Sequence, residues 1–321
     1  IAHGKITISH PTTWERSTVI HNSSSNEENI LLQSQLTLKG TNLTINAPEG
    51  VFAGSDVEGI ALGDGSKLIV TDVDDDPLSK HDVSTISSMN WNSSDPFYGG
   101  LEFFSYGSDN GVILKNSVFH HLIQIKNDGN GVIISNNTFY NCSKIQQATG
   151  DNLLFENNSI FNITTDVGMR YWGNNGTIQN NLFDGDGADP HGTYGAVHII
   201  GDNNTVRFNH FLNMTRSGNI LGTYGESNEI SLYNNYFENI SYNAIATYAN
   251  NNKDYIISNN TFVNVSTGIR ASGENLTIFG NVVQDCGRTE SAGYVGGCIT
   301  VAGGSYGRHD NITISQNVII E

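Results

Sequence analysis

The amino-acid sequence predicts an all-β fold, a parallel β-helix in which short strands wind into stacked coils. Three observations predict it. A short apolar motif that ends in Asn-X-apolar recurs along the chain, and its spacing has a minimum of 21 residues. The 321 residues also include 42 Asn and 35 Gly but only 5 Pro. Together these features indicate many similar turns joined by short strands.

The motif recurs nine times, each time with an Asn directly after an apolar strand. The marker residues are Asn116, Asn137, Asn158, Asn181, Asn209, Asn235, Asn260, Asn281 and Asn317. Successive markers are separated by 21, 21, 23, 28, 26, 25, 21 and 36 residues. A constant minimum with a variable excess is typical of a rigid coil that carries loops of different length. Segments 35–47 and 60–73 alternate in the same way and predict earlier coils.

The abundance of Asn has a structural explanation in this fold. We expect each marker Asn to adopt the left-handed conformation and to hydrogen-bond its equivalents in neighbouring coils, which forms a ladder. A second ladder, interrupted at Gly185, is expected at Asn141, Asn162, Asn213, Asn239 and Asn264. Most of the Asn residues therefore carry no information about a substrate.

The N-terminal segment 1–34 precedes the clear coils and is expected to form a cap over the first coil. Within it, the pattern of residues 26–35 predicts a short amphipathic helix. Residues 35–321 are expected to form a single β-helix domain, cut from a longer chain with further domains.

The three cysteines bear on the cellular location. Cys286 and Cys298 flank a Gly-rich excursion, and the sequence leaves open whether they form a disulfide or remain free thiols, with Cys142 unpaired. Frequent Asn-X-Ser/Thr tripeptides, which are acceptor sites for N-glycosylation, indicate secretion, as a disulfide would. We expect a secreted or cell-surface protein.

The charge of the chain excludes one class of partner. Lys+Arg 15 against Asp+Glu 32 gives a net charge of −17, whereas nucleic-acid binding requires a basic surface. No apolar run approaches the roughly 18 residues of a membrane span. Phosphate-loop, zinc-ligand and dinucleotide-binding motifs are absent, so no cofactor is expected except the calcium ion considered below.

Outward residues on one series of strands predict a binding groove. When these strands are aligned by their inward apolar residues, one outward strip contains Arg170, His198, Gly222, Ala246, Arg270 and Thr300. Two residues further along lie Trp172, Ile200, Tyr224, Tyr248 and Ser272. Aromatic rings stack on pyranose rings and Arg pairs with carboxylates, so the strips fit an acidic sugar chain. The alternative is an ordinary surface with good strand propensity.

The acidic insertion 184–195 is the candidate for catalysis. It contains Asp184, Asp186, Asp189 and His191. Glycoside hydrolysis needs one carboxylic acid and one carboxylate, and crowded carboxylates raise each other's pKa. Two alternatives remain open: a calcium ion near Asp184, Asp186 and Asp189, and a structural turn in which Asp and Gly serve only the backbone.

The repeat resembles the right-handed parallel β-helix superfamily of carbohydrate-active proteins, which includes pectate lyases, polygalacturonases, alginate lyases and mannuronan epimerases. The resemblance covers nearly the whole chain and implies a right-handed helix that acts on a polysaccharide. In its Asn-rich character the chain is most similar to the archaeal disaggregatase family, which degrades the methanochondroitin matrix of methanogens.

A shorter resemblance concerns the insertion. Asp189-Pro190-His191 is similar to the Asp-Pro-His of mannuronan epimerases and related lyases, although the aromatic context that precedes it there is missing in this chain. This likeness implies that His191 or Tyr194 moves the C5 proton of a uronate while Arg170 or Arg270 neutralises its carboxylate.

The sequence therefore predicts a polysaccharide-degrading enzyme that hydrolyses an acidic, uronic acid-containing polysaccharide with loop carboxylates. A polysaccharide lyase or uronate epimerase is the first alternative. A non-catalytic carbohydrate-binding or surface-coat protein is the second, because a fold does not determine a function. The concentration of long loops after Asn181 favours a built site over a uniform scaffold.

Overall fold

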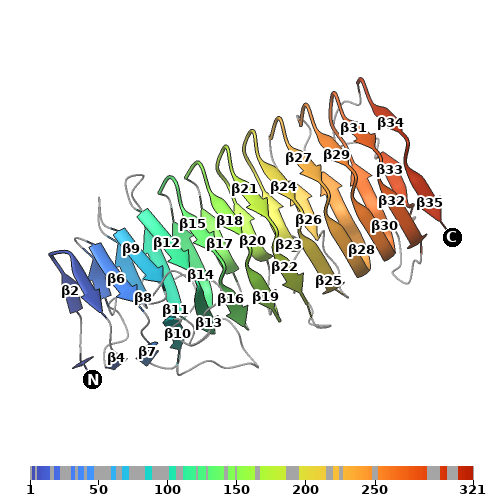
Figure 1. Cartoon of the computed structure of the whole chain (residues 1–321). Coiled ribbons are helices and arrows are strands. Elements are labelled where there is room, and N and C mark those ends of the chain that lie inside the picture. Colours follow the sequence, from blue (N-terminus) through green and yellow to red (C-terminus); the bar gives the residue numbers. More distant parts are fainter. Residues whose placement is uncertain are drawn as a thin grey trace. The chain divides into compact units, whose positions relative to one another are not determined.

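The fold was analysed in a computed structural model (Figure 1). It describes residues 2–3, 6–14, 18–21, 30–32, 35–39, 42–46, 59–62, 67–71, 84–88, 101–105, 111–120, 122–127, 129–140, 144–148, 150–162, 167–185, 195–214, 220–223, 227–247, 252–287, 297–301 and 310–320. Their regular structure is entirely β-strand. The chain forms two compact units, Ile1–Phe161 and Asn162–Glu321, which are described separately as unit 1 and unit 2.

Unit 1 is built from three stacks of parallel strands, which we call sheets 1, 2 and 3 in the order in which each coil visits them. Sheet 1 contains β2 (Ile6–Ile8), β5 (Ile30–Leu32), β8 (Gly59–Leu62), β11 (Leu101–Ser105), β14 (Leu122–Asn127) and β17 (Lys144–Ala148). Sheet 2 contains β3 (Thr12–Trp14), β6 (Gln35–Lys39), β9 (Lys67–Thr71), β12 (Gly111–Lys115), β15 (Ile133–Ser135) and β18 (Leu154–Glu156). Sheet 3 contains β1 (Ala2–His3), β4 (Thr18–His21), β7 (Asn42–Asn46), β10 (Ser84–Ser88), β13 (Ser117–His120), β16 (Thr138–Tyr140) and β19 (Ser159–Phe161).

Unit 2 repeats this arrangement, and two of its strands, β28 (Tyr236–Thr247) and β30 (Thr261–Ala271), run from sheet 3 into sheet 1. The other strands of sheet 1 are β20 (Val167–Tyr171), β23 (Gly195–Ile199), β26 (Leu221–Thr223) and β33 (Ile299–Val301). Sheet 2 contains β21 (Thr177–Gln179), β24 (Thr205–Arg207), β27 (Ser231–Tyr233), β29 (Ile256–Ser258), β31 (Thr277–Phe279) and β34 (Thr313–Ser315). The other strands of sheet 3 are β22 (Leu182–Asp184), β25 (His210–Met214), β32 (Val282–Cys286) and β35 (Val318–Ile320).

Each coil therefore passes once through each sheet, and the predicted parallel β-helix is confirmed. Segments 35–47 and 60–73 contribute β6 to β9, as expected. Within the described part of the chain, no helix has the length and apolarity that a membrane crossing requires.

The helix predicted at 26–35 is wrong. Ile30–Leu32 form β5, which pairs in parallel with β8. Backbone hydrogen bonds to the neighbouring coil outweigh the local helical pattern, as tertiary context commonly does. Residues 18–21 likewise form β4, paired with β7. The capping role of segment 1–34 stays a prediction.

The interior is filled by rows of identical side chains stacked from coil to coil. In sheet 3 of unit 2, the rings of Phe183, Phe211, Phe237 and Phe262 are fully buried and lie 4.8 to 5.0 Å apart between centroids. The corresponding rings in unit 1, Phe119 and Phe139, lie 4.9 Å apart. Parallel in-register pairing lets the same ring recur in four successive coils of unit 2, and Val283 takes this position in the coil that follows Phe262.

The predicted marker ladder is present at the turn between sheets 2 and 3. The side-chain oxygen of Asn235 accepts hydrogen bonds from the backbone nitrogen of Asn209 at 3.1 Å and from its Nδ2 at 3.0 Å. Asn235 Nδ2 in turn donates to Asn260 Oδ1 at 3.0 Å and to the carbonyl oxygen of Val206 at 3.0 Å. The pattern continues through Asn281 to Asn317. Each buried amide thus satisfies backbone groups of the tight turn in the neighbouring coil.

One detail of the ladder prediction is wrong, because the left-handed residue is the one before the ladder Asn. In unit 2 this position is held by Asn180, Phe208, Asn234, Asn259, Gly280 and Gln316, with φ between 52° and 66°. The left-handed residue turns the chain, and the next residue then directs its amide inward. Asn116, with φ 48°, belongs to the turning position, and Ser117 occupies the ladder position, where its backbone nitrogen donates to Asn137 Oδ1 at 3.0 Å.

The second predicted ladder is confirmed in unit 2. Asn239 Nδ2 donates to Asn213 Oδ1 at 3.0 Å, and Asn264 Nδ2 donates to Asn239 Oδ1 at 2.9 Å. Asn162, Asn213, Asn239 and Asn264 are all left-handed. Asn141 lies outside the described residues.

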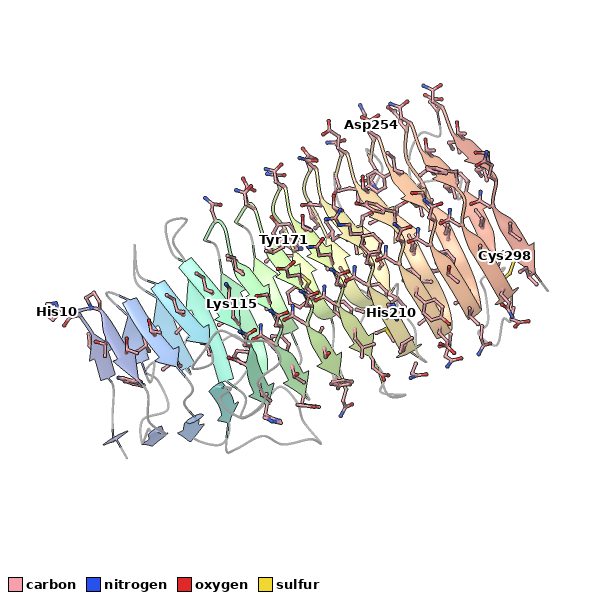
Figure 2. All side chains as sticks on the ribbon, in the orientation of Figure 1. His10, Lys115, Tyr171, His210, Asp254 and Cys298 are labelled. Carbon is pink, nitrogen blue, oxygen red and sulfur yellow. A yellow bond between two sulfur atoms is a disulfide. The ribbon has the colours of Figure 1, made fainter. Side chains whose placement is uncertain are left out.

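A third ladder, which the sequence analysis missed, follows the exposed turns between sheets 1 and 2 of unit 2. Asn203 Nδ2 donates to Asn175 Oδ1 at 2.8 Å, and Asn275 Nδ2 donates to Asp254 Oδ1 at 2.8 Å. Asp254, labelled in Figure 2, marks one of these turns. This turn position holds Asn, Asp or Glu in different coils, so the repeat is not evident from the sequence.

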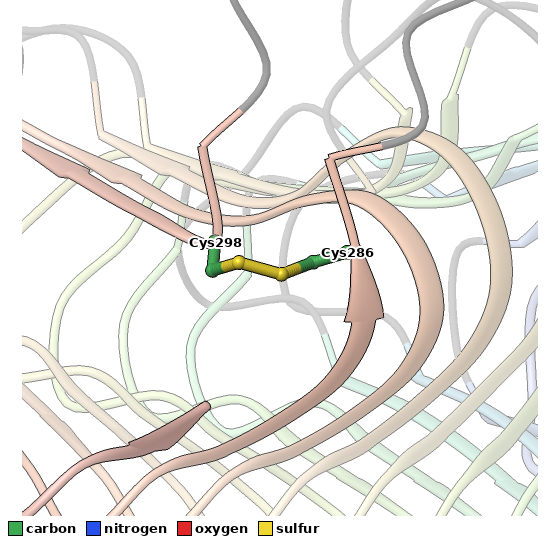
Figure 3. Close-up of a disulfide and its surroundings, with 2 residues drawn as sticks. All are labelled: Cys286 and Cys298. Carbon is green, nitrogen blue, oxygen red and sulfur yellow. A yellow bond between two sulfur atoms is a disulfide. The ribbon is translucent and has the colours of Figure 1, made fainter. Parts of the chain in front are cut away.

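Cys286 and Cys298 form a disulfide, with Cα atoms 5.4 Å apart (Figure 3). This resolves the alternative that the sequence left open. The bond joins the end of β32 to the residue before β33, so it closes the excursion between two strands of the coil. Cys142 lies outside the described residues.

We expect Asn235→Ala to lower the free energy of unfolding by about 3 kcal/mol, because it leaves buried turn groups of the adjacent coil without partners. The matched control is Asn234→Gly at the exposed turning position, which keeps the left-handed conformation and changes stability by less than about 0.5 kcal/mol. Urea denaturation measures both. Equal effects of the two substitutions would contradict the assignment of the ladder to residue 235.

We expect the double variant Cys286→Ser/Cys298→Ser to lose about 2–3 kcal/mol of stability, because a bond across a sequence separation of 12 residues restricts the unfolded chain. A reducing agent should destabilise the wild-type protein by a similar amount and leave the double variant unchanged. Thermal unfolding with and without the reducing agent checks this.

Candidate functional site

The predicted outward strip forms a continuous row across sheet 1 of unit 2. Arg170 pairs with His198, His198 with Gly222, and Gly222 with Ala246. Ala246 pairs in turn with Arg270, and Arg270 with Thr300. We call these six residues the sheet 1 row. The alignment by inward apolar residues is confirmed, since Met169, Val197, Leu221 and Ile245 lie at 0% exposure on the opposite face.

The expectation that the whole row faces solvent is wrong. His198 is only 2% exposed, and Gly222 and Ala246 are also buried, while Arg170, Arg270 and Thr300 are half-buried. The physical reason is that β23 and β26 are buried on both faces, so their outward side chains lie beneath other parts of the chain. The row therefore has a covered centre, with a half-buried guanidinium on each side of it.

The second strip was predicted less well. Trp172 is exposed as expected, and the guanidinium of Arg170 lies 5.3 Å from its ring centroid. Ile200 is half-buried, but Ser272 is 1% exposed, because its hydroxyl donates to the Thr247 carbonyl oxygen at 2.7 Å. Ser272 therefore makes an interior hydrogen bond and does not contribute to the outward surface of sheet 1.

Tyr171, between Arg170 and Trp172, points inward and fixes this end of the row (Figure 2). Its hydroxyl donates to the Asn174 carbonyl oxygen at 2.8 Å. A Cβ atom on Gly176 would lie 2.1 Å from the Tyr171 ring, so a glycine is required there. The buried ring and the alternation of β20 together direct Arg170 and Trp172 to the outer face.

The electrostatics of the row favour an anionic ligand. Burial, together with the smaller effect of the positive charge of Arg170, lowers the pKa of the His198 imidazole to about 3. His198 is therefore neutral at neutral pH and adds no positive charge to the row. Arg170 and Arg270 contribute the positive charge, and each guanidinium can pair with a separate carboxylate of an extended anionic ligand.

Asp184 has a structural role in this arrangement. It lies at the end of β22 in sheet 3, and its Oδ1 accepts a hydrogen bond from Asn213 Nδ2 at 3.0 Å. The carboxylate thus ends the second ladder in unit 2. Gly185 follows, where a Cβ atom would lie 2.9 Å from the Asn213 carbonyl oxygen, so the predicted interruption has a steric cause.

Several predicted site residues lie outside the described residues, and their roles stay predictions. They are Asp186, Asp189, His191, Tyr194, Tyr224 and Tyr248. Over the described ranges, no three His, Cys, Asp or Glu side chains are grouped so that they could hold a metal ion. The calcium site would depend on Asp186 and Asp189 and likewise stays a prediction.

Sheet 2 of unit 2 carries a partly exposed group that was not predicted from the sequence. Arg207, Phe208 and Tyr233 are in mutual contact there. The signal was available in the repeat, because Phe208 is the only aromatic residue among the six left-handed turning positions given above for unit 2.

We expect His198 to make stability depend on pH. The unfolded state has a His pKa near 6.5 and the folded state one of about 3, so the unfolded state binds more protons between these values. The free energy of unfolding should fall as the pH drops from about 6.5 towards 3, by up to about 1.4 kcal/mol per pH unit. Denaturation of the wild-type protein and of His198→Gln over this range checks it, and parallel curves for the two proteins would contradict it.

Comparison with known proteins yields two similar solved structures. The crystal structure of a mutant of the periplasmic alginate epimerase AlgG has a TM-score of 0.40 and 10% sequence identity, over 96% of this chain and 78% of that one. The crystal structure of AlgG itself has a TM-score of 0.36 and 8% identity, with the same coverage. No family model matches the chain. No curated protein matches it either.

Proposed function

We propose that this protein is an enzyme that acts on an acidic, uronic acid-containing polysaccharide bound along sheet 1 of unit 2. The observation that carries the proposal is the sheet 1 row, in which Arg170 and Arg270 lie in register on either side of the neutral His198. Four strand steps separate the two Arg residues, a distance of about 19 Å. A chain of several sugar units would span this length above the covered centre of the row and would meet Trp172 as a stacking surface at one end.

The geometry favours chemistry at C5 of the uronate. The row contains no carboxylate, and Asp184 is engaged by Asn213 in sheet 3. A guanidinium paired with the uronate carboxylate makes the C5 proton more acidic, and a base from the segment before β23, His191 or Tyr194, removes it. In elimination, the electron pair forms the C4–C5 double bond as the C4–O bond breaks, and the departing oxygen takes up a proton to become the hydroxyl group of the released sugar chain. In epimerisation, a proton returns to C5 from the opposite face.

Hydrolysis is the second candidate, because two carboxylates of the insertion, Asp186 and Asp189, directly precede β23 in sheet 1. One would protonate the leaving oxygen, and the other would act as base or nucleophile. The disulfide supports a location in an oxidising compartment, consistent with secretion or attachment to the cell surface.

The products distinguish these reactions. We would incubate the protein with oligouronates and with methanochondroitin, the latter to test the resemblance to disaggregatases. Ultraviolet absorbance from an unsaturated uronate indicates elimination, and deuterium incorporation at C5 from heavy water without cleavage indicates epimerisation. New reducing ends without either signal indicate hydrolysis. Binding without any of the three products would support the non-catalytic alternative and contradict the proposal.

We expect Arg170→Gln and Arg270→Gln each to reduce kcat/KM on the order of 10²-fold or more, because each removes a charge paired with the substrate carboxylate. A matched control is Lys253→Gln, which removes a half-exposed cation whose Nζ lies 3.6 Å from Glu274 Oε2. The control should retain wild-type turnover. Loss of activity in the control equal to that in Arg270→Gln would remove the sheet 1 row from consideration.

A further inference from the structure

At the turn between sheets 2 and 3 of unit 2, one of the left-handed turning positions is occupied by a bulky aromatic residue. The turning position has a left-handed backbone, which favours Asn and Gly because their side chains relieve or avoid the steric clash. Phe208 adopts this conformation with φ 56° although its side chain is bulky. Its ring is 45% exposed, so burial in the core does not compensate for the strain. Strained, exposed residues of this kind occur preferentially at functional sites.

Arg207, the residue before Phe208, is held in place by two neighbouring strands. Its Nε donates to Gln179 Oε1 at 2.8 Å, and its Nη1 donates to the Tyr233 hydroxyl at 2.8 Å. Both acceptors are uncharged, so these two bonds orient the guanidinium without neutralising its positive charge. An orientation fixed in advance lowers the entropy lost on binding a ligand.

Two aromatic rings border this guanidinium. The carbon atom Cζ of Arg207 lies 5.8 Å from the Phe208 ring centroid and 5.9 Å from that of Tyr233. The two rings lie 6.0 Å apart with an interplanar angle of 77°. The group thus combines two flat apolar surfaces at nearly a right angle with a fixed positive charge between them.

We propose that the sheet 2 surface formed by Gln179, Arg207, Phe208 and Tyr233 binds an acidic sugar unit of a polysaccharide. A pyranose ring stacks on an aromatic face, and its carboxylate or sulfate pairs with Arg207. An anionic ligand needs such a local positive charge, because the chain as a whole carries −17. The surface lies on β21, β24 and β27, whereas the sheet 1 row lies on β20, β23, β26 and the strands that follow. It is a second, separate binding site and goes beyond the proposed function.

The test uses the full chain with Arg170→Gln and Arg270→Gln, so that binding at sheet 1 is weakened. Calorimetric titration with a galacturonate hexamer measures the remaining affinity, and maltohexaose serves as the neutral ligand. We expect Phe208→Asn and Arg207→Gln each to weaken hexamer binding about tenfold or more. We expect Arg207→Lys to restore it only in part, because an ammonium lacks the planar fork.

Phe208→Asn separates binding from folding, because it installs the residue found at positions 180, 234 and 259. We expect its Tm to rise by about 2–4 °C while binding is lost. The matched control is Asn259→Phe, which places the same ring at an equivalent turn after Ser258. It should lower Tm and leave binding unchanged.

Two results would overturn the proposal. One is unchanged hexamer affinity in Phe208→Asn and Arg207→Gln. The other is self-association of the wild-type protein that Phe208→Asn abolishes without any effect on sugar binding, as measured by analytical ultracentrifugation. That result would make the surface a contact between copies of the chain. Failure to detect any reaction product would count against the function proposed for sheet 1 and leave this binding result intact.

Discussion

The side-chain amide of the ladder Asn is the interaction on which the rest of unit 2 depends. The tight turn between sheets 2 and 3 buries backbone groups that the strands cannot satisfy, and Asn supplies both a donor and an acceptor in one planar group. Because each amide bonds the next coil, the ladder also fixes the register between coils. A shift by one residue would exchange inward and outward side chains along every strand. The alignment of Arg170, His198 and Arg270 in sheet 1 therefore depends on the Asn ladder, which lies at a different turn of the coil, between sheets 2 and 3.

The fixed and variable parts of each coil have different roles. The turn between sheets 2 and 3 has a constant length, and both of its functional requirements, the left-handed residue and the ladder amide, are met within two residues. The connection from sheet 3 to sheet 1 tolerates insertions, as the segment between β22 and β23 shows. Strands β23 and β26, each of which follows a connection of this kind, are buried on both faces. On sheet 2, Arg207 and Tyr233 are half-buried, and Phe208 in the adjoining turn is exposed.

The sequence predicted the fold and the alignment of the sheet 1 row because both depend on local periodicity. Val197 and Ile269 alternate with His198 and Arg270, and a repeat needs only one such coil to define all others. It did not predict the burial of His198, which depends on what covers the strand. It misplaced Asn116 by one residue, because the ladder and the turning position both favour Asn. It overlooked Phe208, because an aromatic residue beside a strand is ordinary until its backbone conformation is known.

The ladder also bears on how the protein ages chemically. Deamidation begins when the backbone nitrogen of the following residue attacks the side-chain carbonyl of Asn, and it replaces the amide by a carboxylate. The Asn residues of unit 2 that are buried in hydrogen bonds, such as Asn209 and Asn260, are held away from this geometry. Even the exposed Asn175 is followed by Gly176, whose nitrogen donates to Asn204 Oδ1 at 2.6 Å. In unit 2, a fold that relies heavily on a chemically labile residue thus holds the groups that would react in hydrogen bonds, and loss of those bonds would expose them to deamidation.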